Sequence, residues 1–277
     1  MNKLHPVARA RLARWLLVFL VLAASTATVV WWRDNLPGKN NPASSSYQTT
    51  TSTPASDNQS KAGFSKNQYS VNDPASPWVV VNKGRVLPSS YVPANLAEPK
   101  IALNEAASSE NMLLRQVPAA AIEKLVSAAD NDGMKLMLVS GYRSYSTQQS
   151  VYSGYVSSQG KDYANATSAQ PGHSEHQTGL AADIGATSRK CQLDVCFGDT
   201  AEGKWLAANA YKYGFIVRYQ KDKSNLTGYA YEPWHVRYVG NDLAAEINKT
   251  GQTLEQFFSL PAYPDYPVKP YELKSGT

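Results

Sequence analysis

The chain has 277 residues, 43% of them hydrophobic and 18% charged, which is the composition of a globular protein with one sizeable domain or two small ones. Of its 27 basic side chains, five precede residue 34 with no acidic residue among them, and the remaining 22 equal the 22 acidic ones. The formal net charge of +5 thus comes from the five basic residues near the N-terminus. This distribution argues against a nucleic-acid-binding face, and the composition argues against a multi-span membrane protein.

The first predicted element is an apolar helix near the N-terminus. Residues 15–32 form the uncharged run WLLVFLVLAASTATVVWW, which as a helix would span ~27 Å and just cross a bilayer core. Basic residues precede this run, so residues 1–14 are expected to be a cytoplasmic tail and the rest of the chain extracytoplasmic. The sequence therefore predicts a single-pass protein of the cell membrane.

A cleaved signal peptide is the main alternative to this anchor. Ser25–Ala27 would supply the small-residue cleavage site, and the protein would then be secreted. The anchor is favoured because residues 29–32 (VVWW) extend the apolar run past that site. A buried core helix is a third possibility, which the absence of a polar face opposes.

Residues 33–77 are rich in Ser, Thr, Asn, Gln and Pro, a composition that favours a disordered linker. Such a coil reaches roughly 35–40 Å, which suits a domain that works a short distance above a membrane. A low-complexity spacer with no role in positioning the domain is the plainer interpretation. Phe64, Tyr69 and Val71 are exceptions that could pack on the following domain, residues 78–277.

The domain mixes helical and strand patterns without a βαβ rhythm, which predicts an α+β fold around a central antiparallel sheet. Strands are expected at 78–82, 135–140, 214–219 and 230–239. Helices are expected at 118–132, 146–158, 205–213, 242–248 and 254–260, and the tail from residue 261 is expected to be extended on the surface. In the second helix, Ser146 is the expected cap, and the side chains expected to face inward are Val151, Tyr152, Tyr155 and Val156.

Three of the four histidines lie in this domain, two of them near carboxylates. His176 and Asp183 belong to the segment SEHQTGLAAD, and His235 follows Glu232 in EPWH. Histidine nitrogen and carboxylate oxygen bind zinc, and a catalytic zinc site keeps one position open for water. His176, Asp183 and His235 could thus hold one Zn²⁺, with Glu232 as general base. Surface or hydrogen-bonded structural roles for these residues are the plainer alternative.

Four segments carry a resemblance to a known family: SGYRS at 140–144, SEHQTGLAAD at 174–183, YGFIVRY at 213–219 and EPWHVRYVG at 232–240. In order and spacing they resemble the VanY-type D-Ala-D-Ala carboxypeptidases, zinc peptidases that include the LdcB-type L,D-carboxypeptidases. The resemblance covers roughly residues 100–245. It implies the small α+β fold shared with hedgehog signalling domains.

The resemblance also implies roles for single residues. His176, Asp183 and His235 would bind Zn²⁺, and Glu232 would be the catalytic base. Arg143 would stabilise the anionic transition state or hold substrate, unless it only makes a structural hydrogen bond within its loop. The remaining positions that would line the substrate pocket are Gln148, Ser168, Ser174 and Tyr219. For Gln148, a solvated helix residue is the alternative.

His173 and the two cysteines are interpreted as structural. His173 shares a loop with His176, and three protein ligands already suffice for a catalytic zinc. Cys191 and Cys196 are predicted to form a local disulfide if the domain is outside the membrane. Two free thiols are the alternative.

Together these features predict a membrane-anchored, monomeric zinc carboxypeptidase that removes the C-terminal D-Ala from peptidoglycan stem peptides. An endopeptidase of the same chemistry is one alternative, and a non-catalytic cell-wall-binding module is another. Structural zinc sites usually have four protein ligands, whereas this chain offers three and a spare glutamate, which favours catalysis. The sequence leaves open whether the substrate ends in D-Ala-D-Ala or in an L,D bond.

Overall fold

The computed structural model describes residues 64–274. The predicted cytoplasmic tail, the apolar run at 15–32 and the linker up to residue 63 lie outside this range. Within it, no helix combines the length and the apolar character needed to cross a bilayer.

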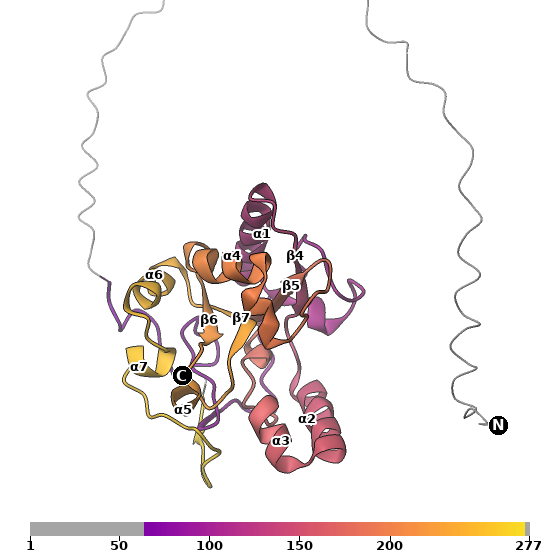
Figure 1. Ribbon diagram of the computed structural model, residues 1–277. Helices are drawn as coiled ribbons and strands as arrows, with labels where there is room; N and C mark the ends of the chain where they lie inside the picture. Colours follow the sequence, from indigo (N-terminus) through magenta and orange to yellow (C-terminus); the bar gives the residue numbers. More distant parts are fainter. Residues whose placement is uncertain (1–63, 275–277) are drawn as a thin grey trace, which may run out of the picture. The chain divides into compact units, whose positions relative to one another are not determined.

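A four-stranded sheet lies at the centre of the domain (Figure 1). Its order is β4-β5-β7-β6, and every neighbouring pair is antiparallel. The strands are β4 (Leu136–Ser140), β5 (Ala181–Ala186), β6 (Phe215–Tyr219) and β7 (Glu232–Tyr238). The helices are α1 (Gln116–Asn131), α2 (Tyr145–Gln159), α3 (Lys161–Thr167), α4 (Ala201–Asn209), α5 (Ser224–Thr227), α6 (Asn241–Thr250) and α7 (Leu254–Phe257). This is the mixed architecture with an antiparallel sheet that the sequence predicts.

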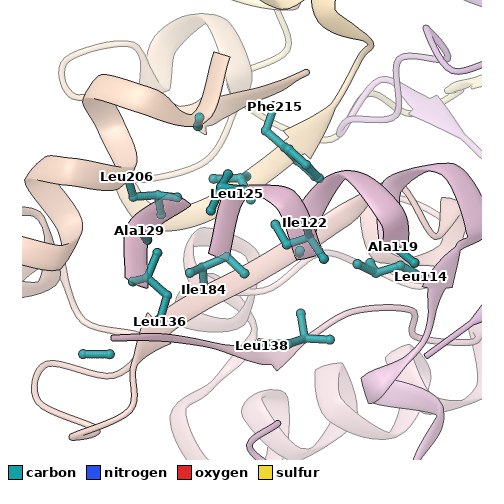
Figure 2. Packing of buried hydrophobic residues seen from close by; sticks show 14 of the residues in the cluster. Leu114, Ala119, Ile122, Leu125, Ala129, Leu136, Leu138, Ile184, Leu206 and Phe215 are labelled. Carbon is teal, nitrogen blue, oxygen red and sulfur yellow. The ribbon is translucent and has the colours of Figure 1, made fainter. Parts of the chain in front are cut away.

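Helix α1 buries one apolar face against the sheet. Ile122, Leu125 and Ala129 recur at helical spacing and are fully buried. Figure 2 shows them beside residues of β4 and β5. The core also takes Ala182, Ile184 and Val236 from the middle strands. Because side chains alternate along a strand, their neighbours Asp183 and His235 point to the other side of the sheet.

The expected strand at 78–82 is wrong, although its residues are buried. Val79, Val80 and Val81 are fully buried, but no regular strand forms there. Arginine side chains satisfy the backbone instead: Arg85 Nε donates to Val80 O at 2.9 Å, and Arg237 Nη2 donates to Val79 O at 2.6 Å. These side-chain hydrogen bonds replace the backbone hydrogen bonds that a neighbouring strand would supply.

Part of the expected linker packs on the domain. Phe64 stacks on Trp78 with ring centroids 5.6 Å apart, and Val71 packs against the same hydrophobic cluster. The packed structure thus extends N-terminal to Trp78, where the sequence analysis places the boundary.

Two short strand pairs flank the sheet. Strand β2 (Leu96–Ala97) pairs antiparallel with β3 (Leu114–Arg115). Strand β1 (Arg85–Val86) pairs parallel with β8 (Tyr271–Glu272) near the C-terminus. The tail is therefore not simply an extended surface segment, since it returns to the domain and buries Leu273 completely.

Helix α2 differs from its prediction in its cap and in its packing. It begins at Tyr145, and Ser144 Oγ, rather than Ser146, caps it by accepting a hydrogen bond from Thr147 N. Its one buried residue is Gln148, while Tyr155 is 39% exposed. The unpredicted α3 packs beside α2 to form a helical hairpin (Figure 1). The apolar positions of α2 therefore do not face the core.

Candidate metal centre and its cleft

Neighbouring strands bring Asp183 and His235 together. Asp183 on β5 pairs in register with His235 on β7. His176 lies in a 3₁₀ helix, Glu175–Thr178, which immediately precedes β5. Gly179 ends that helix in the left-handed conformation at φ 65°, which glycine adopts without strain, and turns the chain into the strand.

The three predicted metal ligands form one compact cluster. Each of His176, Asp183 and His235 offers one ligand atom, and these atoms lie within 4.8 Å of one another. His176 Nε2 is 3.3 Å from Asp183 Oδ2, and His235 Nδ1 is 3.2 Å from Asp183 Oδ1. All three residues are buried. The structure therefore assembles the ligand set that the sequence predicts.

A hydrogen bond orients the ring of His176, and one carboxylate oxygen of Asp183 lacks a hydrogen-bond partner. His176 Nδ1 lies 2.6 Å from Gly141 O, which as a hydrogen bond places the proton on Nδ1 and leaves Nε2 free for the cluster. Asp183 Oδ1 is buried without a hydrogen-bond partner. An orphaned carboxylate oxygen between two imidazoles fits a bound cation, and this nitrogen and oxygen set suits zinc.

The electrostatics of the cluster also favour positive charge. Burial alone would lower the pKa of His235, yet the carboxylates of Asp183 and Glu175 raise it to about 9. Burial opposes ionisation of Asp183 too, but His176 and His235 hold the pKa of that carboxyl well below its usual range. A cation bound by these residues would take the place of the proton that His235 otherwise holds.

Glu232 lies at the edge of the cluster, at the start of β7. Its Oε2 is 3.5 Å from His235 Nδ1, and its side chain is 19% exposed. Burial raises the pKa of Glu232 to about 7, although the positive charge of His235 opposes the shift. A carboxyl group with this pKa can accept and return a proton near neutral pH.

Arg143 is held beside the cluster by the loop between β4 and α2. Its Nη1 donates to Gln148 Oε1 at 3.0 Å, and its Nη2 donates to Ser140 Oγ at 3.0 Å. Gln148 is 1% exposed and donates in turn to Ala169 O at 2.7 Å. Gln148 is therefore a buried support for the guanidinium rather than a solvated helix residue.

A cleft of about 410 Å³ joins these groups. It is lined by all the catalytic, metal-binding and substrate-binding residues that the sequence predicts: Arg143, Gln148, Ser168, Ser174, His176, Asp183, Tyr219, Glu232 and His235. Tyr219 lies with its ring centroid 4.8 Å from that of His235. Ser174 Oγ accepts a hydrogen bond from His176 N at 3.3 Å, so it also shapes the turn that carries the ligand.

His173 lies outside the ligand cluster, as the sequence predicts. Its Nδ1 is 2.9 Å from Asn82 O, and its ring packs edge-on against Tyr266 with centroids 5.1 Å apart. His173 thus joins the N-terminal part of the domain to the tail.

Sequence reasoning missed a buried charge network behind His235. Glu175 Oε1 accepts hydrogen bonds from Arg218 Nε at 2.9 Å and from Arg237 Nη1 at 2.7 Å. Arg218 Nη2 also donates to Glu255 Oε1 at 2.6 Å. The second oxygen, Glu175 Oε2, lies 3.7 Å from His235 Nε2. Glu175 therefore faces His235 on the side opposite the cluster.

One signal could have revealed this network. Arg218 and Arg237 each interrupt a strand of buried residues, yet both are fully buried. Buried arginines require acidic partners. They hold the pKa of Glu175 well below its usual range, against the opposing effect of burial.

Cys191 and Cys196 are joined by a disulfide, as predicted from their spacing. The residues between them include Leu193, Asp194 and Val195, which line the same cleft as the metal cluster. The disulfide loop, residues 191–196, is therefore part of the wall of the site.

The fold and site define a metallopeptidase-like domain with a three-ligand centre, and comparison with known proteins supplies its family. The family described as VanY, D-alanyl-D-alanine carboxypeptidase, matches residues 111–241. "Putative carboxypeptidase YodJ" of Bacillus subtilis (strain 168) is 43% identical over 188 residues, which are 68% of this chain and 69% of the relative. The chain belongs to the VanY family of D-alanyl-D-alanine carboxypeptidases.

Solved structures agree with this assignment. The LdcB LD-carboxypeptidase is similar with a TM-score of 0.65 and 43% identity, over 67% of this chain and 87% of the other. A mutant of the vancomycin resistance D,D-pentapeptidase VanY, solved in complex with Zn(II), is similar with a TM-score of 0.53 and 33% identity, over 65% of this chain and 97% of the other.

Proposed function

We propose that this chain is a zinc-dependent carboxypeptidase that removes the C-terminal D-Ala from peptidoglycan stem peptides. The observation that carries the proposal is the arrangement of His176, Asp183 and His235 within 4.8 Å, in a cleft shared with Glu232. Three ligands and a separate glutamate suit catalysis better than a closed structural site. Family membership and the zinc complex of a VanY enzyme support the same conclusion.

The proposed metal ligands are His176 Nε2, His235 Nδ1 and the Asp183 carboxylate. Zinc bound there would act as a Lewis acid and lower the pKa of water to about 7. Glu232 would take the proton from the attacking water and deliver it to the leaving amine. Its pKa of about 7 suits both transfers.

Arg143 is proposed to stabilise negative charge in the cleft. Gln148 and Ser140 fix its guanidinium through two hydrogen bonds, so little reorganisation is needed when the oxyanion forms. The same group could hold the substrate's terminal carboxylate, assisted by neighbouring hydroxyls. The hydroxyl groups that line the cleft for this purpose belong to Ser168, Ser174 and Tyr219.

The comparisons favour a tetrapeptide with an L,D bond as the first substrate to test. Identity to the LD-carboxypeptidase LdcB is 43%, against 33% to the D,D-pentapeptidase VanY. Mass spectrometry of defined tetrapeptides and pentapeptides after incubation with the protein would measure the preference. Release of alanine from the pentapeptide alone would reverse this assignment.

The variant Glu232→Ala tests the proposed mechanism. Loss of a general acid–base group should lower turnover on the order of 10²–10⁴-fold while zinc content stays near one per chain. Glu98→Ala is the matched control, because Glu98 is exposed and lies outside the cleft. A Glu232→Ala protein with full zinc and full activity would disprove the role, and a wild-type protein that releases no alanine would favour a cell-wall-binding module.

We also propose that the domain is extracytoplasmic and membrane-anchored through residues 15–32. The uncharged run and the preceding basic residues support this topology, and the Cys191–Cys196 disulfide suits an oxidising compartment. Protease added to intact spheroplasts should remove the domain. Complete protection from the protease would rule out this orientation.

A further inference from the structure

The C-terminal tail, residues 261–274, packs on the domain although it lies beyond residues 111–241, which match the family. It follows α7 and is yellow in Figure 1. At its end, Tyr271 N donates to Gly84 O at 2.8 Å, and Leu273 N donates to Val86 O at 2.9 Å. These bonds accompany the pairing of β8 with β1. The tail is therefore anchored by α7 at its start and by β8 at its end.

Tyr266 lies in the middle of this tail and is half-buried. Its ring packs edge-on against His173. Lys83 Nζ lies 5.3 Å from the ring centroid of Tyr266 and donates to Pro264 O at 3.0 Å. Contacts on the ring and on the neighbouring backbone thus set the position of the Tyr266 hydroxyl.

The Tyr266 hydroxyl bonds a segment that borders the cleft. It accepts a hydrogen bond from Gln170 N at 2.8 Å. Gln170 directly follows Ser168 and Ala169, which line the cleft. Helix α3 ends at Thr167, so Gln170 N lies outside the helix and finds its partner in the tail instead. The hydroxyl therefore fixes residues 168–170 from the side away from the cleft.

Residues 168–170 in turn orient Gln148. Its Nε2 donates to Ala169 O at 2.7 Å and to Ser168 Oγ at 3.3 Å, and its Oε1 accepts from Arg143 Nη1 at 3.0 Å. A carbonyl only accepts and a guanidinium only donates, so a single orientation of the Gln148 amide satisfies both neighbours. Tyr266 is thus joined to the Arg143 guanidinium through residues 168–170 and Gln148.

We propose that Tyr266 is a positioning residue for the reaction, and that it acts by holding the segment 168–170, and through Gln148 the guanidinium of Arg143. The inference rests on the proposed function, in which Arg143 faces the negative charge that develops on the substrate. A donor fixed in advance stabilises that charge without reorganisation, so the support should be expressed in kcat.

Tyr266 also has a contact that leads toward the metal centre. Its hydroxyl lies 3.4 Å from the Tyr229 hydroxyl, and the Tyr229 ring lies 4.9 Å from the Tyr219 ring, centroid to centroid. Tyr219 contacts His235 in the same way. This route consists of one long hydrogen bond and two ring contacts, whereas the route to Arg143 consists of shorter hydrogen bonds. The route to Arg143 is therefore the one proposed.

Tyr266→Phe in the full-length chain tests the proposal, because it removes the hydroxyl and keeps the ring. Loss of this hydrogen bond should lower kcat for a stem peptide about three- to ten-fold and leave KM and zinc content unchanged. Tyr263→Phe is the matched control, because Tyr263 is a half-buried tyrosine of the same tail whose ring lies against Gly84, outside the cleft. It should keep the wild-type kcat.

A double-mutant cycle with Arg143→Ala identifies the route. If Tyr266 acts through Arg143, Tyr266→Phe should have no further effect on kcat once the guanidinium is gone. Effects that multiply in the double variant would overturn this route. A loss of zinc affinity in Tyr266→Phe would also overturn it and would assign the effect to Tyr229 and the metal centre.

Hydrogen exchange followed by mass spectrometry gives a readout that does not depend on activity. Residues 168–170 should exchange faster in Tyr266→Phe than in the wild type, and at the wild-type rate in Tyr263→Phe. Equal exchange in all three proteins would overturn the proposal.

Alanine release by the wild-type chain separates the two possible failures. A wild type that releases alanine beside an unimpaired Tyr266→Phe protein rejects the positioning role and leaves the carboxypeptidase. A wild type that releases no alanine rejects the carboxypeptidase, and the positioning role in that reaction fails with it.

Discussion

The two walls of the cleft are built by opposite means. The inner wall, formed by β5, β7 and the 3₁₀ helix Glu175–Thr178, carries buried charged and polar side chains, and its ligands His176, Asp183 and His235 are at most 5% exposed. The outer wall, formed by the α2–α3 hairpin and the disulfide loop, exposes apolar side chains. Fixed geometry on strands suits the proposed chemistry, whereas accessible side chains on helices and a loop are suited to contact with a ligand.

The inner wall needs the charge network behind it. Buried charges are costly unless each is paired. Glu175 bonds Arg218 and Arg237, and Arg218 also bonds Glu255 on α7. The metal centre is thus tied to strands β6 and β7 and to helix α7. In the outer wall, a local disulfide closes the loop and a hydrogen bond between Tyr152 and Asn165 joins α2 to α3.

Arg143→Ala should have the largest effect among the following tests. Loss of a fixed positive charge beside the reacting carbonyl should lower kcat on the order of 10²–10³-fold. Zinc content should stay unchanged, because Arg143 is not a ligand. Steady-state kinetics with elemental analysis would measure both. A change confined to zinc content would place Arg143 in the support of the metal rather than in the chemistry.

Glu175→Gln should lower the zinc affinity of the metal centre, because Glu175 supports the ligand His235. The carboxylate lies 3.7 Å from His235 Nε2, where it can orient the ring and favour the proton on that nitrogen. Substitution of such outer partners typically lowers metal affinity about 10–100-fold. Competition with a chromogenic chelator would measure this, with exposed Glu98→Gln as control. Unchanged affinity in a folded Glu175→Gln protein would show that Glu175 only balances the arginines.

The inner wall of the cleft could be predicted from the sequence more fully than the outer wall. The three metal ligands could be predicted because they lie in short segments that resemble a known family, whereas their spacing alone is a modest signal. The role of Glu232 as a base stays a prediction. Helix α1 could be predicted because its apolar periodicity matches its buried face. Strand β4 could be predicted because its continuous apolar run matches burial on both faces. The network around Glu175 could not, because its partners Arg218, Arg237 and Glu255 meet only in the folded protein.

The outer wall was predicted less well, for a physical reason. Periodicity predicts that Tyr155 faces a core, but α2 has no core beside that face and exposes the ring to the cleft. A functional surface and a buried face have the same pattern of apolar residues. The disulfide itself was predictable from spacing, whereas the position of its loop beside the metal centre required the tertiary structure.

Replacing Cys191 and Cys196 by serine should affect the outer wall alone. Without the disulfide, Leu193 and Val195 lose their fixed positions, so KM for a stem peptide should rise several-fold while kcat and zinc content are retained. The loss of a cross-link over so short a loop should lower the free energy of unfolding by about 2 kcal/mol. Denaturant titration and steady-state kinetics would measure these effects. A fall in zinc content instead would mean that the two walls are not independent.

The smallest expected effect concerns His173, the buried histidine of the domain that is not in the metal cluster. Burial lowers the pKa of His173, although its contact with the Asn82 carbonyl opposes this. The folded state then binds its proton less readily than the unfolded state, whose pKa is about 6.5. Stability should therefore fall as pH drops below about 6.5, by at most about 1.4 kcal/mol per pH unit from this group. Urea midpoints at pH 7 and pH 5 should differ less in His173→Gln than in the wild type. An equal pH dependence in both proteins would assign the effect to other titratable groups and would contradict this role of His173.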